Sequence, residues 1–382
     1  MKIKNMRFII LPCLLVAALL FANADAELEH ECTTWLAFHD ITGNNTNLLH
    51  KNRDAKYRNL SLLLSPESSP IKWVALGDTY FGKAPENPCM GMNEKGLAAA
   101  MNSGEKCTDN STNPKGRGTP DLLRDILSHC STAKEALEML KGFVQKNDYS
   151  HGEKGSIFFF VDKDEAYIAE MTAHFISPMR YDRGYAFRAN IWHNPGMAAY
   201  ADNTIATFLN SANREYMVIT SLNQALRSRG KVTVQDCIDL SRHYKLDNTP
   251  IQRRVCSKST NSAATMEIDR EFPAVLSTIY VLIGHPRHTI CVPAPVCITK
   301  RHPKMPTREW NDAAWRRFDA QGPEADIPAE WLAFEKSSLE KYHRTQDEAR
   351  KLMRAGKHTE AESLLEKTTL KIWDSAAKAL GL

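Results

Sequence analysis

The chain lacks the compositional extremes of fibrous, disordered and nucleic-acid-binding proteins. Glycine and proline each account for 18 of the 382 residues, which excludes collagen-like and low-complexity chains. Charged residues make up 25% and apolar residues 43%, so intrinsic disorder is excluded as well. The 49 Lys and Arg residues barely exceed the 45 Asp and Glu residues and form no concentrated basic block, so polyanion binding has no support. A globular chain with a large core remains, and small-molecule chemistry fits it best.

An apolar run long enough to cross a membrane is also missing at the amino terminus. Three basic residues precede the run from Phe8 to Ala22, which contains Pro12 and is too short to span about 30 Å of hydrocarbon. The small-residue exit Ala24–Ala26 follows. This pattern predicts a cleaved signal peptide over residues 1–26 and a secreted or periplasmic product without membrane contact after cleavage.

Nine cysteines are present, and their spacing fixes no disulfide pairing. Apart from Cys32 and the one in the signal peptide, seven remain, an odd number that cannot all pair internally. A chain of this size does not need bridges to fold, so the sequence leaves the disulfides open.

Strand-type and helix-type patterns alternate in blocks. The strand-type segments are 32–53 (strand, turn, strand), 71–76, four runs within 156–190 that read as a meander, 263–268 and 275–291. The helix-type segments begin at Thr119 and Thr132, both as N-caps, and cover 211–228 and 233–244, the latter capped by Thr233. Since few single helices connect successive strands, we predict a layered α+β fold rather than a doubly wound parallel sheet.

The carboxyl-terminal segment, residues 306–382, is a separate helical extension by its composition. Breaks at Gln321–Pro323 and Ala355–Gly356 separate helices with apolar stripes. One helical pair is too short for a solenoid, so we expect packing on the preceding domain or on a second subunit.

Cys32 is the residue that carries the chemical prediction. It opens a strand six residues after the predicted cleavage point, behind the acidic stretch 27–31. Removal of a short propeptide over 27–31 would give Cys32 a free α-amine beside its thiol. Because both groups ordinarily titrate near neutrality, the amine can take the thiol proton and later deliver it to a leaving amine.

Four strings carry a resemblance to a known family: CTTW at Cys32, HKNRD ending at Asp54, GMNEKGLAAAMNSG over 91–104, and RAN over 188–190. With them the chain resembles the N-terminal-nucleophile hydrolases of the acyl-coenzyme A:6-aminopenicillanic acid acyltransferase type, which are related to penicillin V acylases and choloylglycine hydrolases. The resemblance implies a four-layer αββα sandwich over residues 32–305.

The resemblance also implies roles for residues near the start of that domain. Cys32 would be the nucleophile, and the Asp54 carboxylate would orient its α-amine. Without the resemblance, Asp54 reads as ordinary turn and ion-pair chemistry. In bile-salt and penicillin acylases an arginine stands three residues before this aspartate. Here Lys51 takes that place and Arg53 adjoins Asp54, so the sequence leaves open which cation supports the thiolate.

Two donors for the oxyanion follow from the same resemblance. They are the backbone N–H of Asn102 and the side-chain amide of Asn190, which otherwise read as a turn residue and a strand end. A distal arginine completes the pattern in these families, and Arg253 and Arg254 are the candidates.

The resemblance implies a self-processing cysteine amidohydrolase that cleaves the N-acyl bond of a small linear amide through a thioester acyl-enzyme. An N-acyltransferase of the same family and a related dipeptidase are alternatives. A non-enzymatic secreted binding protein on the same scaffold is the alternative from another class. No cofactor is implied, and the histidines lack the spacing of a metal site. Substrate identity, oligomeric state and the autocatalytic nature of the processing stay open.

Overall fold

The computed structural model describes residues 32–78, 87–109, 113, 115–244, 254–298, 302–303 and 305–382. The predicted signal peptide and propeptide, and Arg253, lie outside these residues. The described residues form two antiparallel sheets. The six-stranded sheet has the order β10 (Tyr185–Arg188), β1 (Thr33–Ala37), β2 (Thr46–Asp54), β11 (Thr260–Asp269), β12 (Thr278–Ile283) and β13 (Val292–Pro295). The seven-stranded sheet has the order β3 (Leu60–Leu64), β4 (Trp73–Asp78), β5 (Asn87–Asn93), β6 (Ala98–Lys106), β7 (Lys154–Val161), β8 (Ala166–Met171) and β9 (Ile176–Tyr181).

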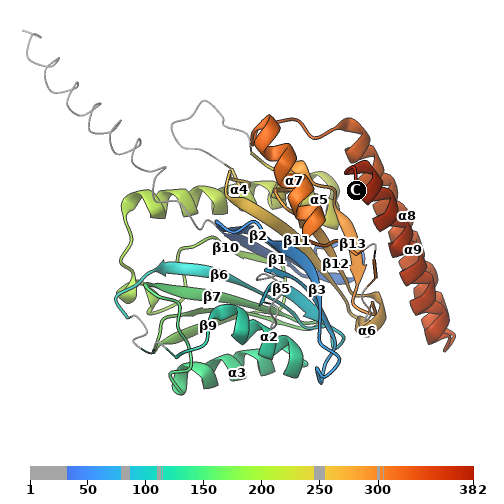
Figure 1. Cartoon of the computed structure of the whole chain (residues 1–382). Helices are drawn as coiled ribbons and strands as arrows, with labels where there is room; N and C mark the ends of the chain where they lie inside the picture. Colours follow the sequence, from blue (N-terminus) through green and yellow to red (C-terminus); the bar gives the residue numbers. More distant parts are fainter. Residues whose placement is uncertain are drawn as a thin grey trace, which may run out of the picture.

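Helices cover the outer face of each sheet. On the six-stranded sheet lie α4 (Ile205–Arg229) and α5 (Val234–Ser241), and on the seven-stranded sheet lie α2 (Thr119–His129) and α3 (Ala133–Gln145). Figure 1 shows the resulting order of helices, sheet, sheet and helices. The predicted α+β class and four-layer αββα sandwich are therefore confirmed.

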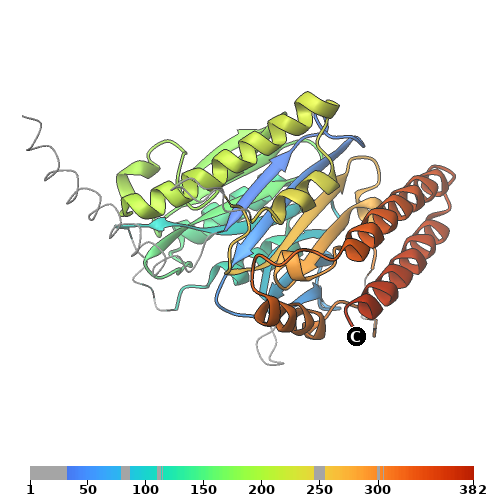
Figure 2. The ribbon, with the colours of Figure 1, turned by 90° about the horizontal axis from the view of Figure 1, so that it is seen from above.

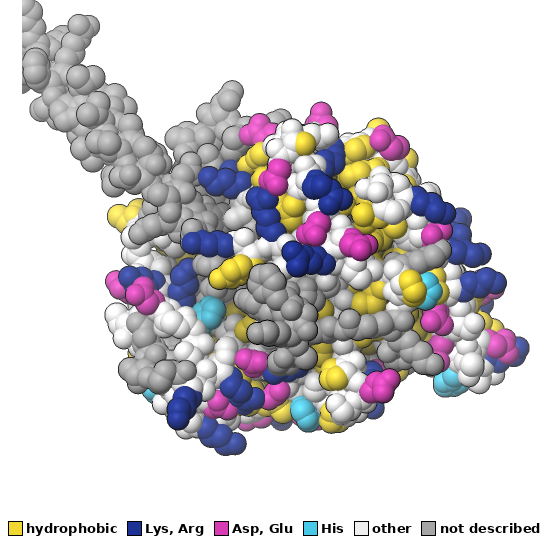
Figure 3. Space-filling view, viewed as in Figure 1, with side chains coloured by type: hydrophobic (Ala, Val, Ile, Leu, Met, Phe, Trp, Pro, Cys, Tyr) yellow, Lys and Arg dark blue, Asp and Glu magenta, His cyan; other side chains and the backbone are white. Residues whose placement is uncertain are grey.

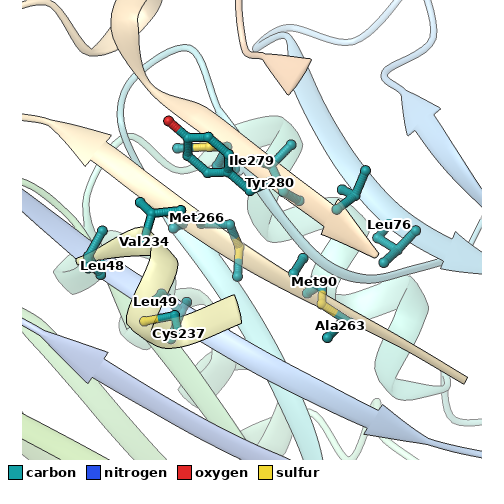
Figure 4. Packing of buried hydrophobic residues seen from close by; sticks show 14 of the residues in the cluster. Leu48, Leu49, Leu76, Met90, Val234, Cys237, Ala263, Met266, Ile279 and Tyr280 are labelled. Carbon is teal, nitrogen blue, oxygen red and sulfur yellow. The ribbon is translucent and has the colours of Figure 1, made fainter. Parts of the chain in front are cut away.

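The core fills the spaces between these layers. Figure 4 shows Val234 and Cys237 of α5 beside residues of β2 and β11, in the same cluster as Leu76 and Met90 of the other sheet. The indole N–H of Trp35 on β1 donates to the Cys237 sulfur at 3.4 Å. A second cluster lies between α2, α3 and the seven-stranded sheet. Burial on both faces makes both sheets apolar along most of their length.

The carboxyl-terminal helices are α7 (Arg308–Gln321), α8 (Ala329–Arg354) and α9 (His358–Ala379), separated at the two predicted breaks. The α8–α9 pair lies along the β13 edge of the six-stranded sheet, as Figure 2 shows from above. Trp373 of α9 is fully buried, and its indole N–H donates to the Pro293 carbonyl at 2.8 Å. The pair therefore packs on the preceding domain, one of the two predicted arrangements.

Two predicted helix caps, whose partner residues are close in sequence, are confirmed. Thr132 caps α3, and Thr233 and Asp236 form the capping box of α5. Thr119 is a correction, because Gly118 occupies the N-cap position and Thr119 is already helical.

Two strand predictions need correction. Only β7, β8 and β9 form the meander, because β10 leaves it and pairs with β1 in the other sheet. The segment 275–291 is not one strand. Strand β12 is followed by a turn and a short 3-10 helix (Pro286–His288), and β13 begins only at Val292.

On the face seen in Figure 3, basic side chains lie among acidic ones, in keeping with the small net charge of +4. Among the described helices, none is long and apolar enough to cross a membrane.

Candidate active site

Cys32 lies at the end of the six-stranded sheet, between that sheet and its neighbour. It directly precedes β1, and Thr33 pairs with Asn52, so Cys32 stands beside the last residues of β2. The side chain is buried, with 6% of its surface exposed. A thiol in this position is shielded from bulk water.

The next layer of the site is built from Thr34, Lys51 and Asn102. Thr34 and Lys51 are cross-strand partners, so their side chains lie on the same face of the six-stranded sheet. This face is turned toward the seven-stranded sheet. There the Thr34 hydroxyl and the Lys51 ammonium both donate to Asn102 Oδ1, each at 2.7 Å. Asn102 lies on β6, so these bonds join the two sheets beside Cys32.

Lys51 is the cation in contact with Cys32. Its side chain is fully buried, and burial lowers the pKa of Lys51. The electrostatic interaction with Cys32, and after it a hydrogen bond with the Cys32 side chain, act in the opposite direction. The interactions that offset the burial of this ammonium therefore come mainly from Cys32 itself.

Arg53 is committed elsewhere. Its guanidinium binds the Asp78 carboxylate on β4, with a shortest distance of 2.6 Å. Burial raises the pKa of Asp78, and Arg53 opposes that shift. Of the two cations that the sequence left open, Lys51 contacts the sulfur and Arg53 supports Asp78.

Asp54 ends β2, three residues beyond Lys51, and is 2% exposed. Its Oδ2 accepts a hydrogen bond from the Ser257 hydroxyl at 3.0 Å. By strand register the backbone of Cys32 runs alongside this end of β2. Arg254, one of the two candidate distal arginines, lies with its guanidinium carbon 5.6 Å from the centre of the Tyr244 ring, and within the described residues no hydrogen bond joins it to Cys32.

The side chain of Asn102 has its hydrogen-bonding capacity filled. Its Nδ2 donates to the carbonyls of Arg188 and Ala189 at 3.1 and 2.9 Å, while Oδ1 receives Thr34 and Lys51. The side chain therefore ties β6 to the end of β10 and has no further N–H to offer a ligand.

Asn190 follows β10 and faces the same region. Its Nδ2 donates to the Ser103 carbonyl at 2.7 Å, and its Oδ1 accepts from Arg214 at 2.9 Å. An amide nitrogen carries two N–H bonds, and only one of them is used within the described residues. The second N–H is left for another acceptor.

Arg214 on α4 is the functional candidate that sequence reasoning missed. It contacts the Cys32 carbonyl, the Thr33 hydroxyl and Asn190. The helix itself was predicted, but an arginine within it has no signal that marks it as part of a site. Only the packing of α4 on β1 brings it there.

Buried acidic residues fix the segment that carries Asn190. Glu170 on β8 binds Arg188 at 2.6 Å and accepts the backbone N–H of Asn194, and Glu215 accepts the N–H of Ala189 at 2.8 Å. These bonds hold the backbone on both sides of Asn190. Among the described residues, no group of three or more His, Cys, Asp or Glu side chains is arranged to hold a metal ion.

The fold and this cluster define an N-terminal-nucleophile-hydrolase type of α+β protein. The chain belongs to the acyl-coenzyme A:6-aminopenicillanic acid acyl-transferase family, whose model matches residues 41–290. The matched range contains Lys51, Asn102, Asn190 and Arg214, and Cys32 lies nine residues before it.

Solved structures with a similar fold include two variants of the conjugated bile acid hydrolase from Clostridium perfringens. They have TM-scores of 0.47 and 0.46 and identities of 12% and 11%, and the alignments cover 71% of this chain and 93% and 95% of theirs. The penicillin V acylase from Agrobacterium tumefaciens has a TM-score of 0.43 and 14% identity, with 70% of this chain and 87% of that chain covered. No curated protein matches the chain.

Proposed function

We propose that this protein is a secreted or periplasmic, self-processing cysteine amidohydrolase that cleaves the N-acyl bond of a small linear amide. The observation that carries the proposal is the buried contact of the Cys32 sulfur with Lys51, whose ammonium also binds Asn102. A buried lysine costs folding free energy unless its partners compensate. Its place beside the thiol of a chain in this family is explained by support of a thiolate.

The reaction starts after removal of residues 27–31. The free α-amine of Cys32 accepts the thiol proton, and the thiolate is stabilised by the Lys51 ammonium. Asp54, at the adjacent end of β2, orients the amine. Processing thus supplies the base on the same residue as the nucleophile.

The thiolate adds to the amide carbonyl and forms a carbon–sulfur bond, and the carbonyl oxygen becomes an oxyanion. The backbone N–H of Asn102 and the free amide N–H of Asn190 donate to this oxygen. Collapse breaks the carbon–nitrogen bond, and the α-ammonium gives its proton to the leaving amine. Water then adds to the thioester carbonyl and gives a proton to the α-amine, and the carbon–sulfur bond breaks to release the acid and the thiolate.

Acyl transfer is the second candidate, because the matched family model is named for it. In that reaction an amine replaces water in the last step. Both reactions pass through the same thioester, so they differ only in the acceptor that reaches it.

The proposal is tested in two stages. Intact-mass analysis of the secreted protein should give a chain that starts at Cys32. The mature protein is then screened with N-acyl amides, penicillin V, conjugated bile salts and dipeptides, and the released amine is measured with and without an added amine acceptor. An amino terminus at Glu27 with no turnover of any class would contradict the proposal and favour the binding-protein alternative.

A further inference from the structure

Arg214 joins the nucleophile to the oxyanion donor. One of its terminal nitrogens donates to the Cys32 carbonyl at 2.5 Å and to the Thr33 hydroxyl at 2.8 Å. The other donates to Asn190 Oδ1 at 2.9 Å. The side chain is 2% exposed, so these bonds are made away from water.

The guanidinium is itself held in place by its own helix. Its Nε donates to Asn210 at 3.0 Å, and a terminal nitrogen donates to Ser211 at 3.2 Å. These residues precede Arg214 by one helical turn. The planar fork is therefore oriented by α4 before any substrate binds.

The bond to Asn190 decides which end of that amide faces the site. A guanidinium has only donors, so it can donate to Oδ1 but cannot form a hydrogen bond with Nδ2, which is also a donor. Rotation of the amide by 180° would place Nδ2 against the guanidinium and Oδ1 against the Ser103 carbonyl. Both contacts would be repulsive, so Arg214 fixes the amide with its N–H bonds toward Ser103 and the site.

We propose that Arg214 is a positioning residue that fixes the Cys32 backbone and the donor end of Asn190 in one rigid arrangement. This inference rests on the proposed function and adds a residue from α4 to it. Arg214 donates to the backbone carbonyl of Cys32 and to the side chain of Asn190, the donor to the oxyanion. Arg214 itself does not contact the substrate.

The test compares Arg214→Gln and Arg214→Lys with Arg242→Lys. Arg242 is similarly buried, at 4% exposure, but binds Glu335 on α8. Acylation is followed with 4-nitrophenyl acetate, whose carbonyl carbon bonds to the Cys32 sulfur as 4-nitrophenolate leaves. We expect both Arg214 variants to lose about 10²-fold in kcat with little change in KM, as for a small misplacement of reacting groups. Lysine should not rescue, because one ammonium cannot reproduce the fork. Arg242→Lys should keep the kcat of the folded protein.

A double-mutant cycle with Asn190→Ala separates positioning from general stability. If Arg214 acts through Asn190, Arg214→Gln should cost much less in the Asn190→Ala background than alone. Iodoacetamide labelling of Cys32 gives a second readout that needs no oxyanion. Loss of the Arg214 bonds should loosen the backbone at Cys32 and raise the labelling rate of its thiol several-fold, while acylation falls.

Fully additive losses, or acylation and labelling rates that both equal those of wild type in Arg214→Gln, would overturn the inference. Failure of the proposed function has a different signature. In that case wild-type Cys32 reacts with iodoacetamide but releases no nitrophenolate, and the labelling rate of Arg214→Gln still decides whether Arg214 holds Cys32.

Discussion

Replacement of Lys51 by methionine separates stability from activity at this site. Lys51 is fully buried and donates to Asn102 Oδ1 at 2.7 Å beside the Cys32 sulfur. Methionine keeps the length of the side chain and removes the charge. The Thr34 hydroxyl still donates to Asn102 Oδ1, so the substitution leaves no buried acceptor without a donor.

The stability effect follows from the direction of the pKa shift. Burial lowers the pKa of Lys51 in the folded state, so the unfolded state binds this proton more tightly. Folding is therefore opposed wherever the unfolded lysine is protonated. Wild-type stability should rise with pH as the pH passes from the folded towards the unfolded pKa. Removal of the charge recovers a desolvation cost of several kcal/mol and loses a charged hydrogen bond of about 1.5–3 kcal/mol. We expect the free energy of unfolding of Lys51→Met at pH 7 to equal that of wild type or to exceed it by up to about 2 kcal/mol. It should also lack this pH dependence.

The activity effect has the opposite sign. Loss of the ammonium removes a neighbouring cation from the proposed thiolate. One preorganised electrostatic contact of this kind is worth about 2.7–4 kcal/mol of barrier, or about 10²–10³ in kcat. The acylation burst with 4-nitrophenyl acetate should fall by that factor, and Lys51→Arg should retain more activity than Lys51→Met.

The assay pairs urea unfolding with the acylation burst for Lys51→Met, Lys51→Arg and Lys134→Met. Lys134 is an exposed lysine of α3, so its replacement controls for the loss of one positive charge. The contrary result is a free energy of unfolding for Lys51→Met that lies more than about 2 kcal/mol below that of wild type, together with a preserved burst. That result would make Lys51 a structural residue.

Three further predictions concern other parts of the chain. Cys32→Ala should retain residues 27–31 by intact mass if removal is autocatalytic, and complete trimming would show that another protease acts. Burial raises the pKa of Glu105 from 4.5 to about 7, so the folded state holds a proton that the unfolded state releases, and stability should fall by roughly 3 kcal/mol between those pH values. Glu105→Gln should remove this fall in urea titrations at pH 5 and pH 8, and an identical fall would contradict the assignment. Trp373→Ala should destabilise the protein by about 3–5 kcal/mol in thermal unfolding, because the indole is fully buried. A loss below 1 kcal/mol would show that α9 contributes little.

The parts of the fold that were predictable are those set by local chemistry. The hairpin of β1 and β2 follows from strand alternation around a turn, and α5 follows from the capping pair Thr233 and Asp236. The departure of β10 from the meander was not predictable in this way. Its partner, β1, lies about 150 residues earlier, and pairing between such distant strands leaves no local pattern.

The site residues likewise divide into those that a sequence motif predicts and those that depend on the tertiary structure. Cys32, Lys51, Asn102 and Asn190 were found because each lies in a string of the family resemblance, and three of them meet at one hydrogen-bonded cluster. The choice between Lys51 and Arg53 depends on the tertiary structure. Both side chains face the seven-stranded sheet, where Arg53 forms an ion pair with Asp78 on β4 and Lys51 interacts with Cys32.

The free-energy cost of burying a charge explains why Lys51 and its polar partners lie together at one end of the two sheets. Each sheet is buried on both faces along most of its length, so a charge between the sheets has little water to solvate it. Lys51 meets its acceptor only where β1, β2 and β6 come together, and the carbonyls of Arg188 and Ala189 in turn hold Asn102 there. A charge two residues earlier on β2, on the same face of the strand, would lie in the position of Leu49, within the apolar core. Moving the lysine there by the pair Leu49→Lys and Lys51→Leu should therefore prevent folding, although the composition is unchanged. Circular dichroism of the purified variant would test this directly.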